Sequence, residues 1–430
     1  MLSLEKIGDV LLNEQSKVAW LLVLMVLSRW YRSLHEHVRV AHGDKAHPVI
    51  KRWKSSSRVL REGYRPPAWW SIGTQYLVGS LHTVYHNVVR ELRPVAEVSY
   101  DRELFKLKCG ATVGLDWAKR SGELEAPCKH DSSKPIIFIH HGLAGCSKSQ
   151  YVKSMVYQLV RQNKYRVVVM VARGCGGVPL TTPYGFTAAG FDDLAQVATH
   201  LRKENPDAKM FAVGYSLGAG LLANYLGRAG KASVFSGACV VSPCWDFEKT
   251  TPYFDVWSRH FLAASLQGYT EENREAVSKH EKVDLDKAMA ATCVREFDAH
   301  AVVPVHGFGS VDDYYAKSSP ITYAHQITTP TLSFNADDDP VCSVEGAHIM
   351  QQKKIFGPGL VIARTARGGH VSWGEGILGH ASFMDRVILE WLDACFEHEF
   401  GEDHALQSAQ EVAQDVADRV SKAANVKLAA

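Results

Sequence analysis

The chain lacks most of the features that would place it in a specialised structural class. It has no internal repeat, no low-complexity tract and no run of about 20 apolar residues of the kind that spans a bilayer. Its formal net charge is only +2, so the composition indicates no nucleic-acid partner. What remains is a chain of 430 residues, 46% hydrophobic and 22% charged, which is long enough for one large globular domain with extensions.

The cysteines exclude two further classes of protein. Their spacing matches neither a metal site nor a disulfide framework, and an odd number without a recognisable signal peptide favours a reducing compartment. The nine positions are Cys109, Cys128, Cys146, Cys175, Cys239, Cys244, Cys293, Cys342 and Cys395. We therefore expect an intracellular protein with no metal and no cofactor.

The most informative motif is GYSLG at residues 214–218, which fits the G-x-S-x-G pattern of a nucleophile elbow. In that motif a serine lies on a sharp strand-to-helix turn, and small neighbours let the strained chain pass without a clash. The flanks agree, because residues 209–213 predict a short apolar strand and residues 217–226 an apolar helix. Ser216 is therefore the candidate nucleophile, and an ordinary glycine-bracketed turn is the alternative.

A nucleophilic serine needs a base and an orienting acid. In proteins with a nucleophile elbow these two residues follow the serine in the chain, the acid first and the histidine second. Residues 331–334 predict a strand that runs into three aspartates at 337–339, and residues 360–363 predict another strand, followed by His370. A carboxylate just past the end of such a strand points into the crevice where these sheets bind ligands. His370 would accept the Ser216 proton and later return it to the leaving group, while the acid would fix the tautomer of the imidazole.

The oxyanion hole of this fold class uses two backbone N–H groups, one after the nucleophile and one in an earlier loop. Leu217 would supply the first. Residues 135–140 predict a near-continuous apolar strand that leads into the sequence HGLAG, so Leu143 is the candidate second donor. His140 and His141 lack nearby metal-type ligands, so we expect no metal there.

A series of short segments carries a family resemblance. They are YRPPAWW (64–70), LHTVY (81–85), LDW (115–117), HGLAG (141–145), RGCGG (173–177), REFD (295–298), YY (314–315) and GHV (369–371). Together they resemble the YheT-like branch of the α/β-hydrolase superfamily, which includes several α/β-hydrolase-domain-containing (ABHD) proteins. The resemblance covers roughly residues 63–398 and implies serine hydrolase or acyl-transfer chemistry on fatty acyl esters, including medium-chain esters and phospholipids.

The resemblance also implies which aspartate acts. In the family pattern Asn-x-x-Asp-Asp the first aspartate is catalytic, and that position maps to Asp338. Because this chain has three consecutive aspartates where the family has two, Asp337 and Asp339 stay alternatives.

The first 62 residues are expected to form an N-terminal extension. Residues 18–27 (VAWLLVLMVL) are apolar but only about half the ~20 required to span a bilayer, and residues 28–61 carry nine Lys or Arg against two acids. Such a pair of segments suits the surface of an anionic membrane. We expect peripheral contact with the cytosolic face of an intracellular membrane. A helix packed on the catalytic domain of a cytoplasmic protein is the alternative, and either way deletion of residues 1–61 should spare hydrolysis of soluble esters.

Residues 63–400 predict an α/β-hydrolase domain with a mostly parallel sheet, and residues 401–430 a tail helix. Further strands are expected at 167–172, 210–214 and 238–242, and helices at 149–162, 188–203, 217–227 and 375–398. The aromatic-rich segment at about 243–327 interrupts this alternation. We expect it to form a cap that buries an acyl chain, at roughly 0.8 kcal/mol for each buried CH₂. The alternative for any one of these aromatic side chains is that it fills the core of the cap itself.

The sequence thus predicts a serine carboxylester hydrolase or lipase that acts on fatty acyl esters through an acyl-enzyme. Ser216, Asp338 and His370 form the expected triad, with the amides of Leu143 and Leu217 as oxyanion donors. One alternative is an acyltransferase, for which the spacing His380-x-x-x-x-Asp385 is a weak indication. The other is a non-catalytic binding protein of the same fold.

Overall fold

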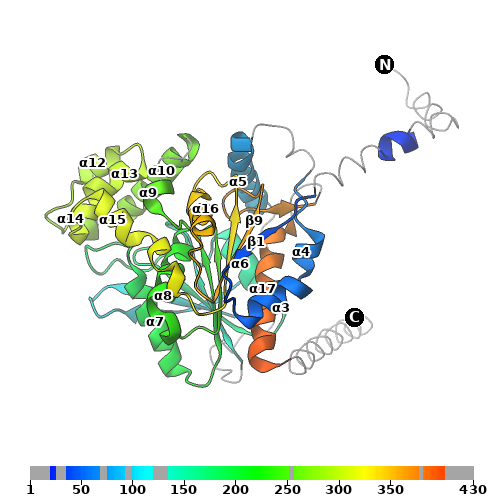
Figure 1. Cartoon of the computed structure of the whole chain (residues 1–430). Coiled ribbons are helices and arrows are strands. Elements are labelled where there is room, and N and C mark those ends of the chain that lie inside the picture. The colour runs from blue at the N-terminus through cyan, green and yellow to red at the C-terminus, as the bar shows by residue number, and fades with distance from the viewer. Residues whose placement is uncertain are drawn as a thin grey trace, which may run out of the picture.

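The computed structural model describes residues 20–25, 35–67, 75–92, 98–119, 134–250, 256–376 and 381–401. They contain a nine-stranded sheet in the order β1-β9-β8-β7-β6-β4-β5-β3-β2, with helices packed on both faces (Figure 1). The strands are β1 (Arg39–His42), β2 (Tyr100–Lys106), β3 (Thr112–Ala118), β4 (Ile136–His140), β5 (Arg166–Val171), β6 (Met210–Tyr215), β7 (Gly237–Val241), β8 (Thr331–Ala336) and β9 (Leu360–Thr365).

Two groups of helices surround the sheet. The helices of the main domain are α3 (Pro48–Ser56), α4 (Arg58–Glu62), α5 (Gln75–Leu92), α6 (Gln150–Arg161), α7 (Phe191–Glu204), α8 (Leu217–Ala229), α16 (Glu345–Gln352) and α17 (Phe383–Phe400). Between β7 and β8 lie α9 (Phe247–Thr250), α10 (Val256–Glu272), α11 (Arg274–Val277), α12 (Leu285–Ala290), α13 (Val294–Phe297), η5 (Asp298–Val302), α14 (Val303–His306) and α15 (Val311–Ser318). This second group gathers on one side of the molecule, away from α3, α4 and α17 (Figure 1).

The centre of the sheet is parallel, as predicted. Strands β4 to β9 form five consecutive parallel pairs, while β1, β2 and β3 pair antiparallel at the edges. All residues of β4 to β9 are buried, because helices cover both faces, and this explains why these strands read as continuous apolar runs. Their carboxyl ends meet at one edge, where the loops carrying the candidate residues begin.

The last helix begins later than predicted. The expected helix at 375–398 is observed as α17, which starts at Phe383 and ends at Phe400. The Ser382 side chain caps it by accepting a hydrogen bond from the Asp385 N–H at 3.1 Å, and Glu375 lies in the short strand β10 (Gly374–Glu375). The helix predicted for residues 401–430 lies outside the described residues apart from Gly401, which follows α17.

Residues 39–62 belong to the folded domain, so the boundary expected after residue 62 is corrected. Strand β1 pairs with β9 along its whole length. On α3, the buried Trp53 packs edge-on against the buried Trp391 of α17, with ring centroids 5.3 Å apart. The Glu390 carboxylate of α17 accepts hydrogen bonds from the first backbone N–H groups of α4, at 3.0 and 3.1 Å.

Only residues 20–25 of the predicted membrane-associating segment are described, and they are helical with exposed apolar side chains. Within the described ranges, every helix is too short or too polar to cross a bilayer.

The corrected boundary predicts different outcomes for two truncations. Deletion of residues 1–62 removes β1, α3 and α4 and should destabilise the domain strongly, whereas deletion of residues 1–34 should leave urea unfolding close to that of the full chain. The single substitution Trp53→Ala should cost about 3–5 kcal/mol of unfolding free energy, because it opens a cavity against Trp391. Lys51→Ala, at an exposed position of the same helix, is the control. A 1–62 deletion with an unchanged urea midpoint would contradict the assignment.

Candidate active site

Ser216 lies at the turn between β6 and α8 in a strained backbone conformation, with φ 52° and ψ −117°. The turn closes because its flanking glycines have no side chains. A Cβ on Gly214 would lie 2.7 Å from the carbonyl oxygen of Gly218, and a Cβ on Gly218 would lie 2.3 Å from that of His141. The Ser216 N–H donates to the Val241 carbonyl at 2.9 Å, which ties the turn to β7. The predicted nucleophile elbow is therefore present in its geometry.

The histidine and an aspartate meet this serine in a continuous hydrogen-bonded row. His370 Nε2 lies 2.8 Å from Ser216 Oγ, and His370 Nδ1 lies 2.9 and 3.0 Å from the two carboxylate oxygens of Asp339. The aspartate is thus one residue later than the expected Asp338, and the predicted register of the acid is wrong. Ser216 and His370 are brought together as predicted.

Local hydrogen bonding explains why Asp339 takes this place. Its Oδ1 also accepts the backbone N–H groups of Val341 and Cys342, both at 2.8 Å, and its side chain is 1% exposed. These two bonds fix the side chain with its carboxylate toward Nδ1 of His370, where it can orient the imidazole.

Asp338 and Asp337 point elsewhere. The Asp338 carboxyl accepts the Gly369 N–H at 2.8 Å. Burial raises the pKa of Asp338 to about 8 and neighbouring Asp339 adds to the rise, although the Gly369 bond opposes it, so this carboxyl is largely neutral at pH 7. Asp337 forms ion pairs with Arg39 of β1 and with Arg364 of β9, the second at 3.0 Å. Neither carboxylate forms a hydrogen bond with the imidazole.

Helix α5 holds the loop that carries His370. Thr83 Oγ1 accepts the His370 N–H and donates to the Gly79 carbonyl, each at 2.8 Å. Two turns further along, the buried Arg90 guanidinium donates to the Val371 carbonyl at 3.0 Å. No sequence motif marks Thr83 or Arg90 as functional positions, although Thr83 falls within the family segment LHTVY.

Of the two residues in the acyltransferase spacing, Asp385 does not contact Ser216 or His370. Asp385 is buried in the first turn of α17, where its carboxylate accepts the Ser154 hydroxyl at 2.5 Å and neighbours Arg90. His380 lies outside the described residues. Asp385 therefore acts as a packing and charge partner of Arg90.

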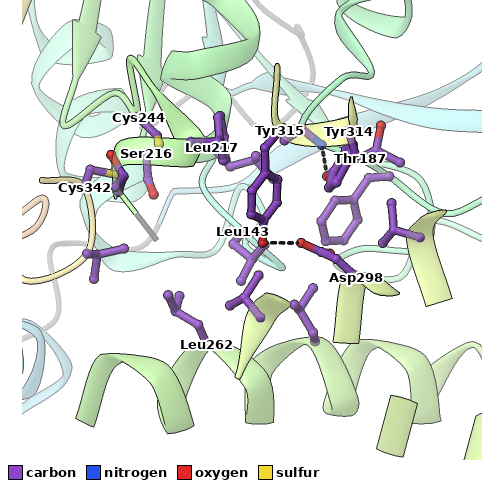
Figure 2. A pocket seen from close by; sticks show the side chains of 18 residues that line it. Leu143, Thr187, Ser216, Leu217, Cys244, Leu262, Asp298, Tyr314, Tyr315 and Cys342 are labelled. Carbon is purple, nitrogen blue, oxygen red and sulfur yellow. Dashed lines mark hydrogen bonds between the residues drawn. The ribbon is translucent and has the colours of Figure 1, made fainter. Parts of the chain in front are cut away.

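Both predicted oxyanion donors line the same pocket as Ser216 (Figure 2). Leu217 is the first residue of α8, and its N–H has no acceptor within the helix. The N–H of Gly142 donates to the Tyr151 hydroxyl at 2.8 Å, which leaves the next amide, that of Leu143, as the candidate in that loop. A Cβ on Gly142 would lie 3.2 Å from Ser216 Cβ, so the loop passes directly over the nucleophile.

His141 shapes this loop. Its Nδ1 lies 2.7 Å from the Gly142 carbonyl oxygen, and its Nε2 accepts the Ala172 N–H at 3.0 Å. Burial lowers the pKa of His141 to about 4 and that of His140 to about 3, so both rings are neutral at pH 7. In the described part of the chain no His, Cys, Asp and Glu side chains gather in a way that could hold a metal ion.

The family segments LDW (115–117) and RGCGG (173–177) support the edge of the sheet that carries the candidate site. Arg102 of β2 forms a bidentate ion pair with the buried Asp116, at 2.6 and 2.7 Å, and donates to the Gly176 carbonyl. Arg173, at the end of β5, forms a second bidentate pair with Asp193 of α7, both bonds at 2.6 Å. These charges fix loops around the site and do not contact Ser216.

The pocket in front of Ser216 extends beneath the helices between β7 and β8 (Figure 2). Its walls are mostly apolar. The lining residues are Leu143, Phe186, Thr187, Ala188, Ser216, Leu217, Cys244, Phe247, Thr250, Leu262, Leu266, Val294, Asp298, Val302, Tyr314, Tyr315, Val341 and Cys342. An apolar channel that ends at a serine hydroxyl, an imidazole and two backbone amides can hold an acyl chain with its ester carbonyl at the nucleophile.

Comparison with known proteins gives one matching family model, two relatives and one solved structure. A family model described as serine aminopeptidase, S33, matches residues 131–355. The chain is 31% identical over 350 residues to phospholipase ABHD3 of Homo sapiens, covering 79% of this chain and 81% of that protein. It is 30% identical over 277 residues to monoacylglycerol lipase of Saccharomyces cerevisiae, covering 61% and 58%. Among solved structures, acylaminoacyl peptidase of Pyrococcus horikoshii matches with a TM-score of 0.43 at 15% identity, covering 72% and 43%.

The positions of the two buried aspartates predict opposite results for isosteric variants. Asp339→Asn should lower kcat for p-nitrophenyl butyrate by about 10⁴-fold, because an amide favours the wrong tautomer of the imidazole. Asp338→Asn replaces a carboxyl that is already largely neutral, and kcat should fall by less than about tenfold. Steady-state kinetics of both variants decide between the registers. A kcat near the wild-type value in Asp339→Asn would contradict the assignment of Asp339 as the acid.

Proposed function

Because this chain belongs to the ABHD family of α/β-hydrolases, we propose that it is a serine hydrolase that cleaves fatty acyl esters of lipids through an acyl-enzyme intermediate. The observation that carries the proposal is the row Ser216 Oγ, His370 and Asp339, with contacts of 2.8 to 3.0 Å. The pocket in front of Ser216 and the names of the relatives, a phospholipase and a monoacylglycerol lipase, support lipid esters as the substrate class.

In the first half-reaction Ser216 Oγ attacks the ester carbonyl while His370 Nε2 takes the hydroxyl proton. The resulting oxyanion is stabilised by the N–H groups of Leu143 and Leu217, and donors of this kind typically contribute about 10²–10³-fold each in kcat. Asp339 holds the imidazole by its Nδ1 and stabilises the imidazolium. His370 then gives the proton to the leaving alcohol, and the acyl group stays on Ser216.

In the second half-reaction a water molecule replaces the alcohol. His370 removes a proton from this water, which attacks the acyl carbonyl, and the fatty acid leaves as Ser216 regains its proton. The strained turn keeps Ser216 Oγ exposed to both the ester and the water, while the apolar walls bury the chain, at roughly 0.8 kcal/mol for each CH₂.

Ser216→Ala should abolish both labelling by a fluorophosphonate probe and hydrolysis of p-nitrophenyl octanoate, since each needs the hydroxyl. Ser278→Ala, an exposed serine of the region between β7 and β8, should keep both activities and serves as the matched control. In-gel fluorescence and an esterase assay give the two readouts. Undiminished labelling of the Ser216→Ala protein would mean that another residue is the nucleophile.

We further propose that the N-terminal segment tethers the enzyme to the cytosolic face of an intracellular membrane. The apolar run at 18–27 and the basic residues that follow support this, because each basic residue near an anionic surface contributes about 1 kcal/mol. Basic residues inside the folded part, such as Arg52 and Arg58, form ion pairs with Glu397 and Glu62, so we place the tether mainly before residue 35.

Fractionation of cells that express the full chain and the 1–34 deletion tests the tether. The full chain should sediment with membranes at low salt and be released in part at high salt, because screening weakens only the electrostatic share. The deletion should be in the supernatant while it still hydrolyses soluble esters. A full chain that stays wholly in the supernatant at low salt would rule the tether out.

A further inference from the structure

The pocket in front of Ser216 contains one carboxyl group among its lining residues, and the proposed mechanism does not use it. This is Asp298, which is 4% exposed and is the first residue of the π-helix η5. Figure 2 shows it on the side of the pocket opposite Ser216, with Leu143 and Tyr315 between them. Single π-helical turns often occur at functional sites, because the extra residue re-aims a side chain.

The Asp298 carboxyl has few partners. The Tyr315 hydroxyl donates to Oδ2 at 3.0 Å, and this is the single hydrogen bond that the carboxyl receives within the described ranges. A carboxylate offers about four acceptor positions, so most of its capacity is unused. Arg295, whose charge acts on this carboxyl, donates to the exposed Asp312 at 2.5 Å and lies over the Tyr315 ring, 5.6 Å from its centroid.

An empty or purely apolar pocket would be an unfavourable environment for the Asp298 carboxyl, because its hydrogen-bonding groups would have too few partners. Asp298 shares its walls with Leu143, Leu266, Val294 and Val302, and burial raises its pKa to about 7. The carboxyl therefore exists in both protonation states near neutral pH and can either accept or donate a hydrogen bond. A plain alkyl chain that filled the pocket would leave this hydrogen-bonding capacity unsatisfied, which disfavours its binding.

We propose that Asp298 and Tyr315 form a polar subsite that binds a hydroxyl group on the chain of the ester, remote from the scissile bond. A hydroxyl is both donor and acceptor, so it can pair with this carboxyl in either state and with the tyrosine. The enzyme should therefore prefer chains hydroxylated at the matching distance over plain alkyl chains of equal length. This inference rests on the proposed cleavage of esters at Ser216.

Matched pairs of p-nitrophenyl esters test the subsite. Alkanoates from C4 to C12 are compared with their ω-hydroxy counterparts, and a second series carries the hydroxyl on the alcohol part instead, since the pocket is open to either arm of the ester. The measured quantity is the ratio of kcat/KM, hydroxylated over plain. It should peak at one chain length in one of the series, at about tenfold or more.

The double variant Asp298→Leu/Tyr315→Phe removes both polar partners together, so no buried group is left unpaired. Its ratio should fall to about one or below at that length. Tyr314→Phe is the matched control, because that neighbouring hydroxyl accepts the Ala188 N–H at 2.9 Å instead of bonding the carboxyl, and its ratio should follow the wild type. Taking a ratio cancels any effect of these changes on the shared chemical step.

A wild-type ratio of one or less at every length in both series would overturn the subsite, as would a preference that survives in the double variant. Calorimetric binding of the same pairs to Ser216→Ala separates this result from the function of the site. Preferential binding of the hydroxylated partner, together with no turnover by the wild type, would support the subsite and refute ester hydrolysis at Ser216. Turnover of plain esters with no preference for the hydroxylated partner would support ester hydrolysis and refute the subsite.

Discussion

The strained turn at Ser216 sets the geometry on which the rest of the site depends. A residue at φ 52° costs energy that the neighbouring structure must offset, and it is held here by β6, by α8 and by the bond from the Ser216 N–H to β7. Because the turn is this tight, the loop after β4 passes over it with only glycine at the closest points. Ser216, Leu217 and Leu143 thereby line one pocket, and we propose that the two leucine amides bind the carbonyl oxygen of an ester there.

The second constraint is the loop that carries the imidazole. Two glycines precede His370, so the loop needs contacts with its neighbours to hold its position. They come from Thr83 and Arg90 of α5 and from the Asp338 carboxyl. This explains why the family segment LHTVY, far from Ser216 in sequence, belongs to the site. It also gives Asp385 a role: its buried carboxylate balances the charge of Arg90. The place of the imidazole loop thus depends in part on a buried guanidinium that lies outside the proposed reaction.

Much of the fold was predictable from the sequence, because β4 to β9 are buried on both faces and read as apolar runs, and because GYSLG leaves few alternatives for a turn. The register of the acid was not. Consecutive aspartates have identical side chains, and the one that meets His370 is chosen by the N–H groups of Val341 and Cys342, which no local pattern reveals. Strand β1 was missed for a related reason: its four residues are polar enough to read as a tail, and only pairing with β9 defines them.

The proposed mechanism requires a covalent acyl group on Ser216, and mass spectrometry tests for it most directly. The protein is mixed with a slowly deacylating ester, quenched in acid within the first turnover, and digested. We predict an added acyl mass on the peptide that contains Ser216, and this mass should disappear as the reaction proceeds. In a His370 variant that is acylated with an activated ester, the same acyl mass should accumulate. Complete hydrolysis with no acyl adduct at any time, or an adduct on a different residue, would contradict the account.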